Sequence, residues 1–416
     1  MKTVLRNIKG TKDILADETS AWLYLENYIH NFFKKFGYKE IRTPSFENTD
    51  LFLRSIGNDT DIVSKEMYSW VDQGNNNLTL RPELTAPVVR SFIQHQLGKQ
   101  TKSHKLYYLG SLYRRERPQK GRFRQFKQFG IEAFGSEFPE QDAEIIYMAY
   151  QLYHSLNIND LELRINSIGS KESRLKYKKE LQKYFLQYEN QLTETSKKRL
   201  IQNPLRILDT KVDFEIEIIK NAPKIIDFLD DEDKAHFQQV LDILDSMKVP
   251  YVLDNYLVRG LDYYSRTVFE IQSNSIGAQS ALCGGGRYDY LVEELGGEST
   301  PAIGFAAGFE RLIMAMDIHQ ESIVETPDIY LIAIGDNAIK FCLNAANELR
   351  NEKGLIVITD TLQRSLKSQM KDANRLKVKF AIVIGDNELS SNKVSIKNMS
   401  TGEQKNIFID DIVNYF

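Results

Sequence analysis

The chain has 416 residues, which exceeds the size at which one hydrophobic core usually keeps growing, so we expect two or three domains. Its 42% apolar and 27% charged residues are typical of an ordinary globular protein and exclude a disordered or repetitive chain. The net charge of -3 excludes a uniformly basic surface, so any nucleic-acid site must be a local patch.

The cysteines and the first residues exclude further classes of protein. Cys283 and Cys342 lack the spacing of a zinc site or a disulfide framework, so we predict reduced thiols and no metal site. The first ten residues lack the apolar segment of a signal peptide, and no uncharged apolar stretch is long enough to span a bilayer. We therefore expect a cytoplasmic protein without a membrane segment.

Hydrophobic periodicity predicts the first elements. Apolar residues recur at helical spacing between Thr19 and Phe36, and Gly37 is placed to end that amphipathic helix. Because Pro44 disfavours helix before it, residues 38–44 should be extended, at a sheet edge or an interface. Short strand-type stretches follow at 78–80, 105–109, 125–132 and 263–271. Turns separate these stretches, which predicts an α+β fold, an antiparallel sheet flanked by helices.

Two later regions differ in character. Residues 171–250, approximately, are rich in Lys, Glu, Asp, Gln and Leu, and we interpret them as a helical insertion in a first domain that covers residues 1–325. From Pro327 onward, strands at 328–335, 354–359 and 380–385 alternate with helices at 337–353 and 365–377. This alternation predicts a separate α/β domain at residues 326–416.

Residues 113–127 form the most informative motif, Tyr-Arg-Arg-Glu-Arg-Pro-Gln-Lys-Gly-Arg-Phe-Arg-Gln-Phe-Lys. Its cations greatly outnumber its single acid, and aromatic residues are interleaved among them. Arginine presents a planar donor fork that matches phosphate oxygens, and a ring such as Phe126 stacks on a base. A solvated basic hairpin is an equally weighted alternative.

A second motif covers residues 257–270. In a strand at residues 261–270, one face would carry four side chains, Asp262, Tyr264, Arg266 and Val268. Arg259 would precede that strand in a turn that aims its side chain into a cleft. Core or cross-strand packing is the alternative explanation for the tyrosines.

Two glycine-containing segments complete the set. The run from Gly284 to Gly286 removes every Cβ from a stretch of backbone, which permits close approach of another group; a flexible turn is the alternative. The spacing matches neither a dinucleotide fold nor a phosphate-binding loop. Residues 301–312 should begin extended and become helical, with Arg311 projecting from the first turns. The alternative for this arginine is a surface salt bridge with Glu310 or a neighbouring residue.

Taken in order, these segments resemble the motifs of class II aminoacyl-tRNA synthetases. The first helix with Pro44, residues 113–132 and residues 302–312 look like the three motifs that define the class. Residues 258–264, Val-Arg-Gly-Leu-Asp-Tyr-Tyr, and 284–289, Gly-Gly-Gly-Arg-Tyr-Asp, are similar to two signatures of the histidyl-tRNA synthetase family. The C-terminal α/β domain resembles the family's anticodon-binding module.

The resemblance implies a homodimeric histidine–tRNA ligase that activates L-histidine with ATP and Mg²⁺ and transfers it to tRNA-His. In the family, the histidine carboxylate attacks the ATP α-phosphorus directly, so arginines and Mg²⁺ stabilise the developing charge and no protein nucleophile acts. By resemblance, the catalytic residues are Arg114 at the α-phosphate and Arg259 at the carboxylate and α-phosphate. ATP binding would also involve Arg311 at the outer phosphates, Phe126 on the adenine, and Arg122.

Histidine selection calls for buried hydrogen-bond partners to the imidazole, because a polar mismatch discriminates better than fit alone. By resemblance, those partners are Glu132 and Tyr264. The α-amino group would be held by Glu83, Thr85 and Gln128, and the pocket walls completed by Tyr263 and Tyr288. Arg114 and Arg259 would reach the same histidine.

Three residues depart from the family pattern. Leu84 and Pro87 stand where many bacterial members have small residues, and Lys127 stands where a histidine is frequent. The first two affect the loop around the amino group, and Lys127 affects a contact near the nucleotide.

Two alternatives share part of this pattern. The regulatory subunit of ATP phosphoribosyltransferase has the same fold, but it typically lacks the anticodon-binding domain and has a degraded Arg-Gly-Leu-Asp-Tyr-Tyr signature. A class II synthetase for proline, threonine or glycine would explain the class motifs but not the two histidine signatures.

Overall fold

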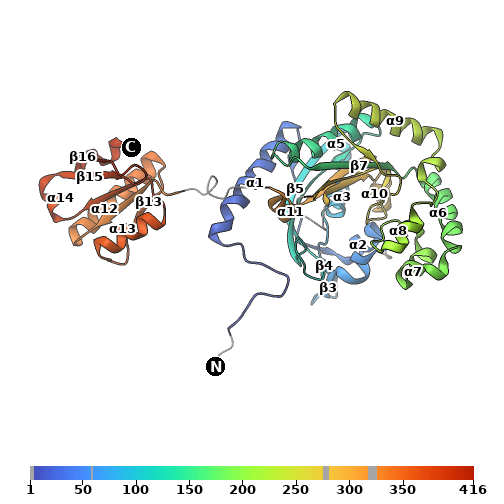
Figure 1. The fold of residues 1–416 in the computed structure, drawn as a ribbon, viewed down its shortest axis with the longest axis horizontal. Helices are drawn as coiled ribbons and strands as arrows, with labels where there is room; N and C mark the ends of the chain where they lie inside the picture. Colours follow the sequence, from blue (N-terminus) through green and yellow to red (C-terminus); the bar gives the residue numbers. More distant parts are fainter. Residues whose placement is uncertain (1–3, 58–59, 275–280, 317–325) are drawn as a thin grey trace. The chain divides into compact units, whose positions relative to one another are not determined.

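The computed structural model describes residues 4–57, 60–274, 281–316 and 326–416. The chain divides into two compact units, residues 1–319 and 320–416 (Figure 1). The domain boundary expected between residues 325 and 326 adjoins residues 317–325, which lie outside the described residues. Among the helices of the described ranges, none is long and apolar enough to cross a membrane.

An eight-stranded sheet forms the centre of the larger unit, in the order β1-β5-β6-β11-β10-β9-β7-β8. Its strands are β1 (Lys39–Glu40), β5 (His104–Tyr113), β6 (Gln125–Phe134), β7 (Leu161–Ser167), β8 (Val252–Leu253), β9 (Ser265–Ser273), β10 (Ala281–Arg287) and β11 (Ala302–Gly308). The inner pairs are antiparallel and the two edge pairs are parallel. The predicted α+β class is therefore confirmed.

Long helices cover one face of this sheet, among them α1 (Ala16–Lys35) and α5 (Pro139–His154). In α1, Leu25, Ile29 and Phe33 recur at intervals of four residues, so they share one face, and all three are fully buried. The ring of Phe33 lies 6.2 Å from that of Phe305 on β11. The predicted first helix is confirmed, and the extended segment after it contributes the short edge strand β1.

The insertion between β7 and β8 is helical, as expected. It contains α6 (Lys171–Leu186), α7 (Glu194–Gln202), α8 (Asp213–Ile219) and α9 (Asp231–Ser246), with short 3-10 turns at Glu189–Gln191, Pro204–Ile207 and Ile225–Phe228. Ser170, Thr193 and Asp230 begin α6, α7 and α9, because their side chains accept backbone N–H groups of the first turn. Helices α6, α7 and α8 lie together at one end of this unit, in green in Figure 1.

Smaller elements complete the larger unit. They are β2 (Phe46–Asn48), α2 (Thr49–Ile56), a π-helix (Ile62–Glu66), β3 (Tyr68–Val71), β4 (Asn77–Leu80), α3 (Thr85–Gln94), α4 (Leu97–Gln100), α10 (Leu291–Glu294) and α11 (Phe309–Ala315). The strands β2, β4 and β3 form an antiparallel sheet in that order. Helix α3 packs on the sheet face opposite α1, where Val88 and Phe92 share an apolar cluster with Tyr108 and Phe134.

The C-terminal unit alternates between strands and helices, as predicted. Its elements are β12 (Ile329–Ala333), α12 (Asp336–Lys353), β13 (Val357–Thr359), α13 (Leu366–Arg375), β14 (Phe380–Ile384), α14 (Asp386–Ser391), β15 (Lys393–Asn398), β16 (Gln404–Phe408) and α15 (Ile412–Tyr415). The sheet order is β13-β12-β14-β15-β16, with antiparallel β15 and β16 added to three parallel strands. Sequence periodicity did not predict these last two strands.

Two motif segments differ from their predictions. Strand β9 begins at Ser265, so Asp262 and Tyr264 precede it, and Arg266 has a φ of 47°, which breaks the alternation of faces. The proposed four-residue face is therefore wrong. The flexible-turn alternative for the glycine run is also wrong, because Gly284 to Gly286 lie inside β10 and pair with both β9 and β11.

Candidate active site

Two adjoining cavities lie on the sheet face opposite α1. The first, here the arginine cavity, has a volume of about 200 Å³. The predicted site residues that line it are Arg114, Arg122, Phe126, Gln128, Arg259 and Arg311. The second, here the tyrosine cavity, has a volume of about 160 Å³. The predicted residues that line it are Glu83, Thr85, Arg114, Gln128, Glu132, Arg259, Tyr263, Tyr264 and Tyr288. Every predicted site residue thus lines at least one cavity, and Arg114, Gln128 and Arg259 line both.

Strand β6 serves both cavities because its even-numbered residues share one face. Phe126 lines the arginine cavity, Glu132 lines the tyrosine cavity, and Gln128 stands between them. Lys127 points to the other face, where its ammonium group pairs with Glu26 and lies 5.5 Å from the ring centre of Phe309. This departure from the family pattern therefore lies behind the sheet rather than in either cavity.

Glycines on the neighbouring strands make room for the charged side chains. A Cβ at Gly284 would lie 1.9 Å from Nη2 of Arg259, and one at Gly304 would lie 2.0 Å from Oε2 of Glu132. Both distances are far below van der Waals contact. The close approach predicted for the glycine run is therefore confirmed, and the group that approaches Gly284 is Arg259.

The arginine cavity concentrates positive charge. Arg114 donates from Nε to the carbonyl of Pro82 at 2.8 Å, and its Cζ lies 5.4 Å from the ring centre of Phe126. Arg311 donates from Nη1 to the carbonyl of Ala281 at 2.8 Å. Burial lowers the pKa of Arg311, and the nearby charges of Arg122 and Arg114 lower it further. An anion in this cavity would relieve that repulsion.

Each basic motif had an alternative explanation, a solvated hairpin for residues 113–127 and a surface salt bridge for Arg311. In the 113–127 segment, Arg114 and Arg122 line the arginine cavity, whereas Arg115 and Arg117 are exposed to solvent and line neither cavity. Glu310, the proposed salt-bridge partner of Arg311, accepts the backbone N–H of Lys127 at 2.9 and 3.1 Å. Burial raises the pKa of Glu310 to about 7, so this carboxyl contributes less than a full negative charge near neutral pH.

Arg259 stands at the junction of the cavities and is ion-paired with Glu270 on β9. Burial lowers the pKa of Arg259, but the charge of Glu270 outweighs that effect and raises it, so the guanidinium remains charged. The same guanidinium also lines both cavities. The sequence analysis did not predict Glu270 as the partner of Arg259. Their ion pair forms only because the chain between residues 259 and 270 folds back and brings the two side chains together.

The insertion holds the loop that carries Arg259 and the tyrosines. Asp262 accepts hydrogen bonds from Asn203 at 3.2 Å, just before the 3-10 turn that follows α7, and from Arg206 at 2.9 Å, within that turn. Arg174 of α6 donates to the carbonyls of Asp262 and Tyr264 at 3.3 and 2.5 Å. These residues also escaped the sequence prediction, since nothing local pairs them with a loop more than fifty residues away.

The tyrosine cavity is built around a buried carboxyl group. Glu132 is 1% exposed and accepts hydrogen bonds from Thr85 at 2.8 Å, from Tyr108 at 3.1 Å and from Tyr288. Burial raises the pKa of Glu132 to about 8, although the three hydroxyl donors oppose that shift. Tyr108 was not predicted; its hydroxyl reaches Glu132 because Tyr108 pairs with Gly130, which leaves room for the ring.

A second buried carboxyl and three rings complete this cavity. Glu83 accepts the backbone N–H groups of Thr85 and Ala86 at 2.7 and 2.8 Å, and burial raises its pKa. The ring centre of Tyr263 lies 4.8 Å from that of Tyr264 and 5.7 Å from that of Tyr288. The cavity therefore offers hydrogen-bonding oxygens in an aromatic frame, which suits a small polar ring.

Leu84 and Pro87, the other departures, line neither cavity. Leu84 is 2% exposed and belongs to the apolar cluster under the sheet, and Pro87 lies in the first turn of α3. Proline is tolerated there because the first N–H groups of a helix have no intrahelical partner. Across the described ranges of the chain, no group of three or more His, Cys, Asp and Glu side chains is arranged to hold a metal ion.

Comparisons with known proteins agree with this geometry. A family model described as histidyl-tRNA synthetase matches residues 10–312, and an anticodon-binding-domain model matches residues 328–416. A synthetase domain followed by an anticodon-binding domain defines an aminoacyl-tRNA synthetase, and the sheet and motifs are those of class II.

The particular family follows from the relatives. The chain is 47% identical over 414 residues to a histidine–tRNA ligase of Staphylococcus aureus (strain JH9), with 98% of each chain covered. The structure of apo S. aureus histidyl-tRNA synthetase matches with a TM-score of 0.84 at 41% identity, covering 99% of this chain and 100% of that one. The enzyme from Nostoc sp. PCC 7120 matches with a TM-score of 0.70 at 25% identity, covering 100% and 99%. This chain belongs to the histidyl-tRNA synthetase family.

Proposed function

We propose that the two cavities together perform the histidine–tRNA ligase reaction of the family, with ATP in the arginine cavity and histidine in the tyrosine cavity. The observation that carries this proposal is the shared wall. Arg114, Gln128 and Arg259 line both cavities, so a nucleotide phosphate and an amino-acid carboxylate bound there would meet beside the same cations.

In the arginine cavity, the triphosphate lies along the arginines. Arg311 and Arg122 bind the outer phosphates, where their mutual repulsion in the empty cavity favours a polyanion. Phe126 stacks on the adenine, since an aromatic face accepts any base by stacking. Arg114 approaches the α-phosphate from the wall that both cavities share.

In the tyrosine cavity, Glu132 and Tyr264 recognise the imidazole by hydrogen bonds. An amino acid of similar size without ring nitrogens would not form these hydrogen bonds, and such a polar mismatch discriminates more strongly than an imperfect fit. Glu83, Thr85 and Gln128 hold the α-amino group, and the buried amide oxygen of Gln128 has no partner in the described residues. The rings of Tyr263 and Tyr288 form the walls.

The reaction is an in-line displacement in which the histidine carboxylate attacks the α-phosphorus and diphosphate leaves. Arg259 neutralises the carboxylate as it approaches and the α-phosphate as charge develops there. Mg²⁺ supplies further charge neutralisation on the phosphates when bound. Glu116 and Glu310 at the wall of the arginine cavity would hold it, because Mg²⁺ takes one or two carboxylates together with phosphate oxygens. The tRNA 3′ end then attacks the adenylate, and AMP leaves.

The domain and partner assignments belong to the same proposal. Residues 1–325 form the catalytic domain with its insertion, and residues 326–416 bind the anticodon of tRNA-His, which the match to an anticodon-binding family supports. A homodimer is supported by apolar side chains that α1 and the residue before it leave exposed: Leu15, Leu23 and Tyr24. The protein acts in the cytoplasm, where its tRNA substrate is charged.

Histidine-dependent exchange of labelled pyrophosphate into ATP tests the proposal. With Mg²⁺ and without tRNA, we expect exchange with histidine and none with proline, threonine or glycine. Exchange with one of those amino acids would identify a different class II synthetase. No exchange with any amino acid would indicate a regulatory subunit without catalysis and would overturn the proposal.

A further inference from the structure

A cluster of polar side chains lies where the ends of β9, β10 and β11 meet. Its residues adjoin Tyr264 and Tyr288 of the tyrosine cavity in the sequence. Asp289 follows Tyr288 and accepts at Oδ1 from Arg287 at 3.0 Å and from the backbone N–H of Ala302 at 3.3 Å. Its Oδ2 accepts from the hydroxyl of Ser265 at 3.3 Å, and its own N–H donates to that hydroxyl at 3.1 Å. One carboxylate thus ties the start of β9, the end of β10 and the start of β11.

Arg287 anchors this carboxylate to the body of the domain. Its guanidinium is fully buried and is ion-paired with Asp142 on α5 at 2.7 Å as well as with Asp289. It also donates to the carbonyls of Ser136 and Phe138 at 2.9 and 3.1 Å. Breaking one partner would leave a buried charge uncompensated, so the cluster resists displacement.

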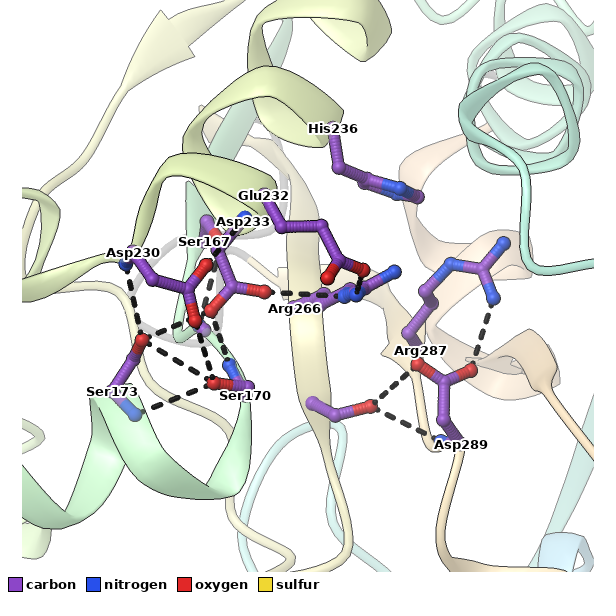
Figure 2. A network of polar contacts seen from close by, with 12 residues as sticks. Ser167, Ser170, Ser173, Asp230, Glu232, Asp233, His236, Arg266, Arg287 and Asp289 are labelled. Carbon is purple, nitrogen blue, oxygen red and sulfur yellow. Dashed lines mark hydrogen bonds and ion pairs between the residues drawn. The ribbon is translucent and has the colours of Figure 1, made fainter. Parts of the chain in front are cut away.

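The same cluster extends to the insertion, as Figure 2 shows. The carboxylate of Asp142 accepts a hydrogen bond from Nε2 of His236 on α9 at 3.0 Å. Arg266, the residue after Ser265, pairs with Asp233 at 3.1 Å and with Glu232, both on α9. The beginning of β9 is therefore held from two sides, by Asp289 and by α9.

We propose that Asp289, held by Arg287, is a positioning residue for histidine recognition. Tyr264 immediately precedes Ser265, and Tyr288 lies between Arg287 and Asp289, so the Asp289–Ser265 contact fixes the spacing of these two tyrosines across the cavity. That spacing brings the hydroxyl of Tyr288 to Glu132. None of the cluster's charged groups lines either cavity. This inference rests on the proposed function, because it concerns the same histidine pocket.

The test compares Michaelis constants in histidine-dependent pyrophosphate exchange. Asp289→Asn should raise the KM for histidine by about tenfold, since it weakens partly buried charge-assisted hydrogen bonds that set the pocket's width. The KM for ATP should stay within about twofold, because no cluster residue contacts the arginine cavity. Ser265→Ala removes a single link and should raise the histidine KM in the same direction by a smaller factor.

A matched control is Asp360→Asn in the C-terminal unit, another carboxylate held by an arginine, Arg364, at 2.5 Å. It should leave both KM values unchanged. A merely structural role for Asp289 would lower the active fraction or the melting temperature without moving the histidine KM, and that result would overturn the inference. If Asp289→Asn does not fold, an unchanged histidine KM in Ser265→Ala overturns it alone. Failure of the proposed function is distinct, because the unmodified protein would then show no histidine-dependent exchange.

Discussion

The two cavities share one strand and one wall, yet they use charge in opposite ways. In the arginine cavity, the guanidinium of Arg311 stays charged although burial and neighbouring cations lower its pKa, so the cations there repel one another. In the tyrosine cavity, burial raises the pKa of Glu132 to about 8, so a carboxyl is kept largely neutral near pH 7. Each cavity therefore holds groups that are electrostatically unfavourable until a ligand arrives.

The difference teaches how one site binds two chemically unlike substrates. A polyanion is bound by several arginine forks that repel one another, whereas a small ring is selected by fixed oxygens with specific hydrogen-bond needs. Arg259 lines both cavities, and its guanidinium is held by an ion pair with Glu270 on β9. We therefore expect substitutions in the tyrosine cavity to change histidine selection, those in the arginine cavity to change nucleotide binding, and those at the shared wall to change catalysis.

The largest effect should follow Arg259→Ala. Removing a cation that stabilises transition-state charge should lower kcat for adenylate formation by about 10³-fold, and histidine binding should weaken far less. Single-turnover adenylate formation and equilibrium histidine binding measure the two effects separately. Turnover at the unmodified rate would contradict the role of Arg259 at the junction.

Glu132→Gln should act on the tyrosine cavity alone. The amide cannot accept all the hydrogen bonds that the carboxyl accepts, so kcat/KM for histidine should fall by about 10²-fold. The KM for ATP should remain close to that of the unmodified protein. A parallel loss of ATP affinity would show that the cavities are not separable in the way their linings suggest.

Gly284→Ala tests the shared wall with a smaller change. The new methyl group would occupy the space of the Arg259 guanidinium, which is the flexible end of its side chain, so Arg259 should move while the fold survives. We expect kcat to fall by about tenfold with little change in melting temperature. In the Arg259→Ala background the same substitution should have no further effect, and additive losses would contradict the displacement.

The last prediction concerns stability and pH rather than catalysis. The pKa of Glu132 is about 8 in the folded protein against an ordinary value of 4.5, so between these values the unfolded chain releases a proton that the folded protein keeps. Stability contributed by this group is therefore lost as pH rises from about 4.5 to about 8. Glu132→Gln cannot titrate, so its melting temperature relative to the unmodified protein should rise over that range in calorimetric scans. A constant difference at all pH values would argue against a buried neutral carboxyl.

Local patterns gave much of the fold and the residues of the site. The first helix was predictable because buried apolar residues recur every four positions in α1, and the C-terminal alternation was predictable because apolar strands and amphipathic helices have different periods. The cavity residues came from a family resemblance carried by short motifs. The glycine run allowed two predictions, and only the paired strand β10 decided between them.

By itself, the sequence determined which side chains are available to the two cavities and most of the elements that carry them. The tertiary structure alone decided that Glu270 pairs with Arg259, that Tyr108 reaches Glu132, and that Asp289 ties three strands. It also decided that β9 begins at Ser265 and that β15 and β16 extend the second sheet. The physical reason is that strand register and long-range hydrogen bonds depend on which segments meet in space, and residues distant along the chain carry no local pattern that records their meeting.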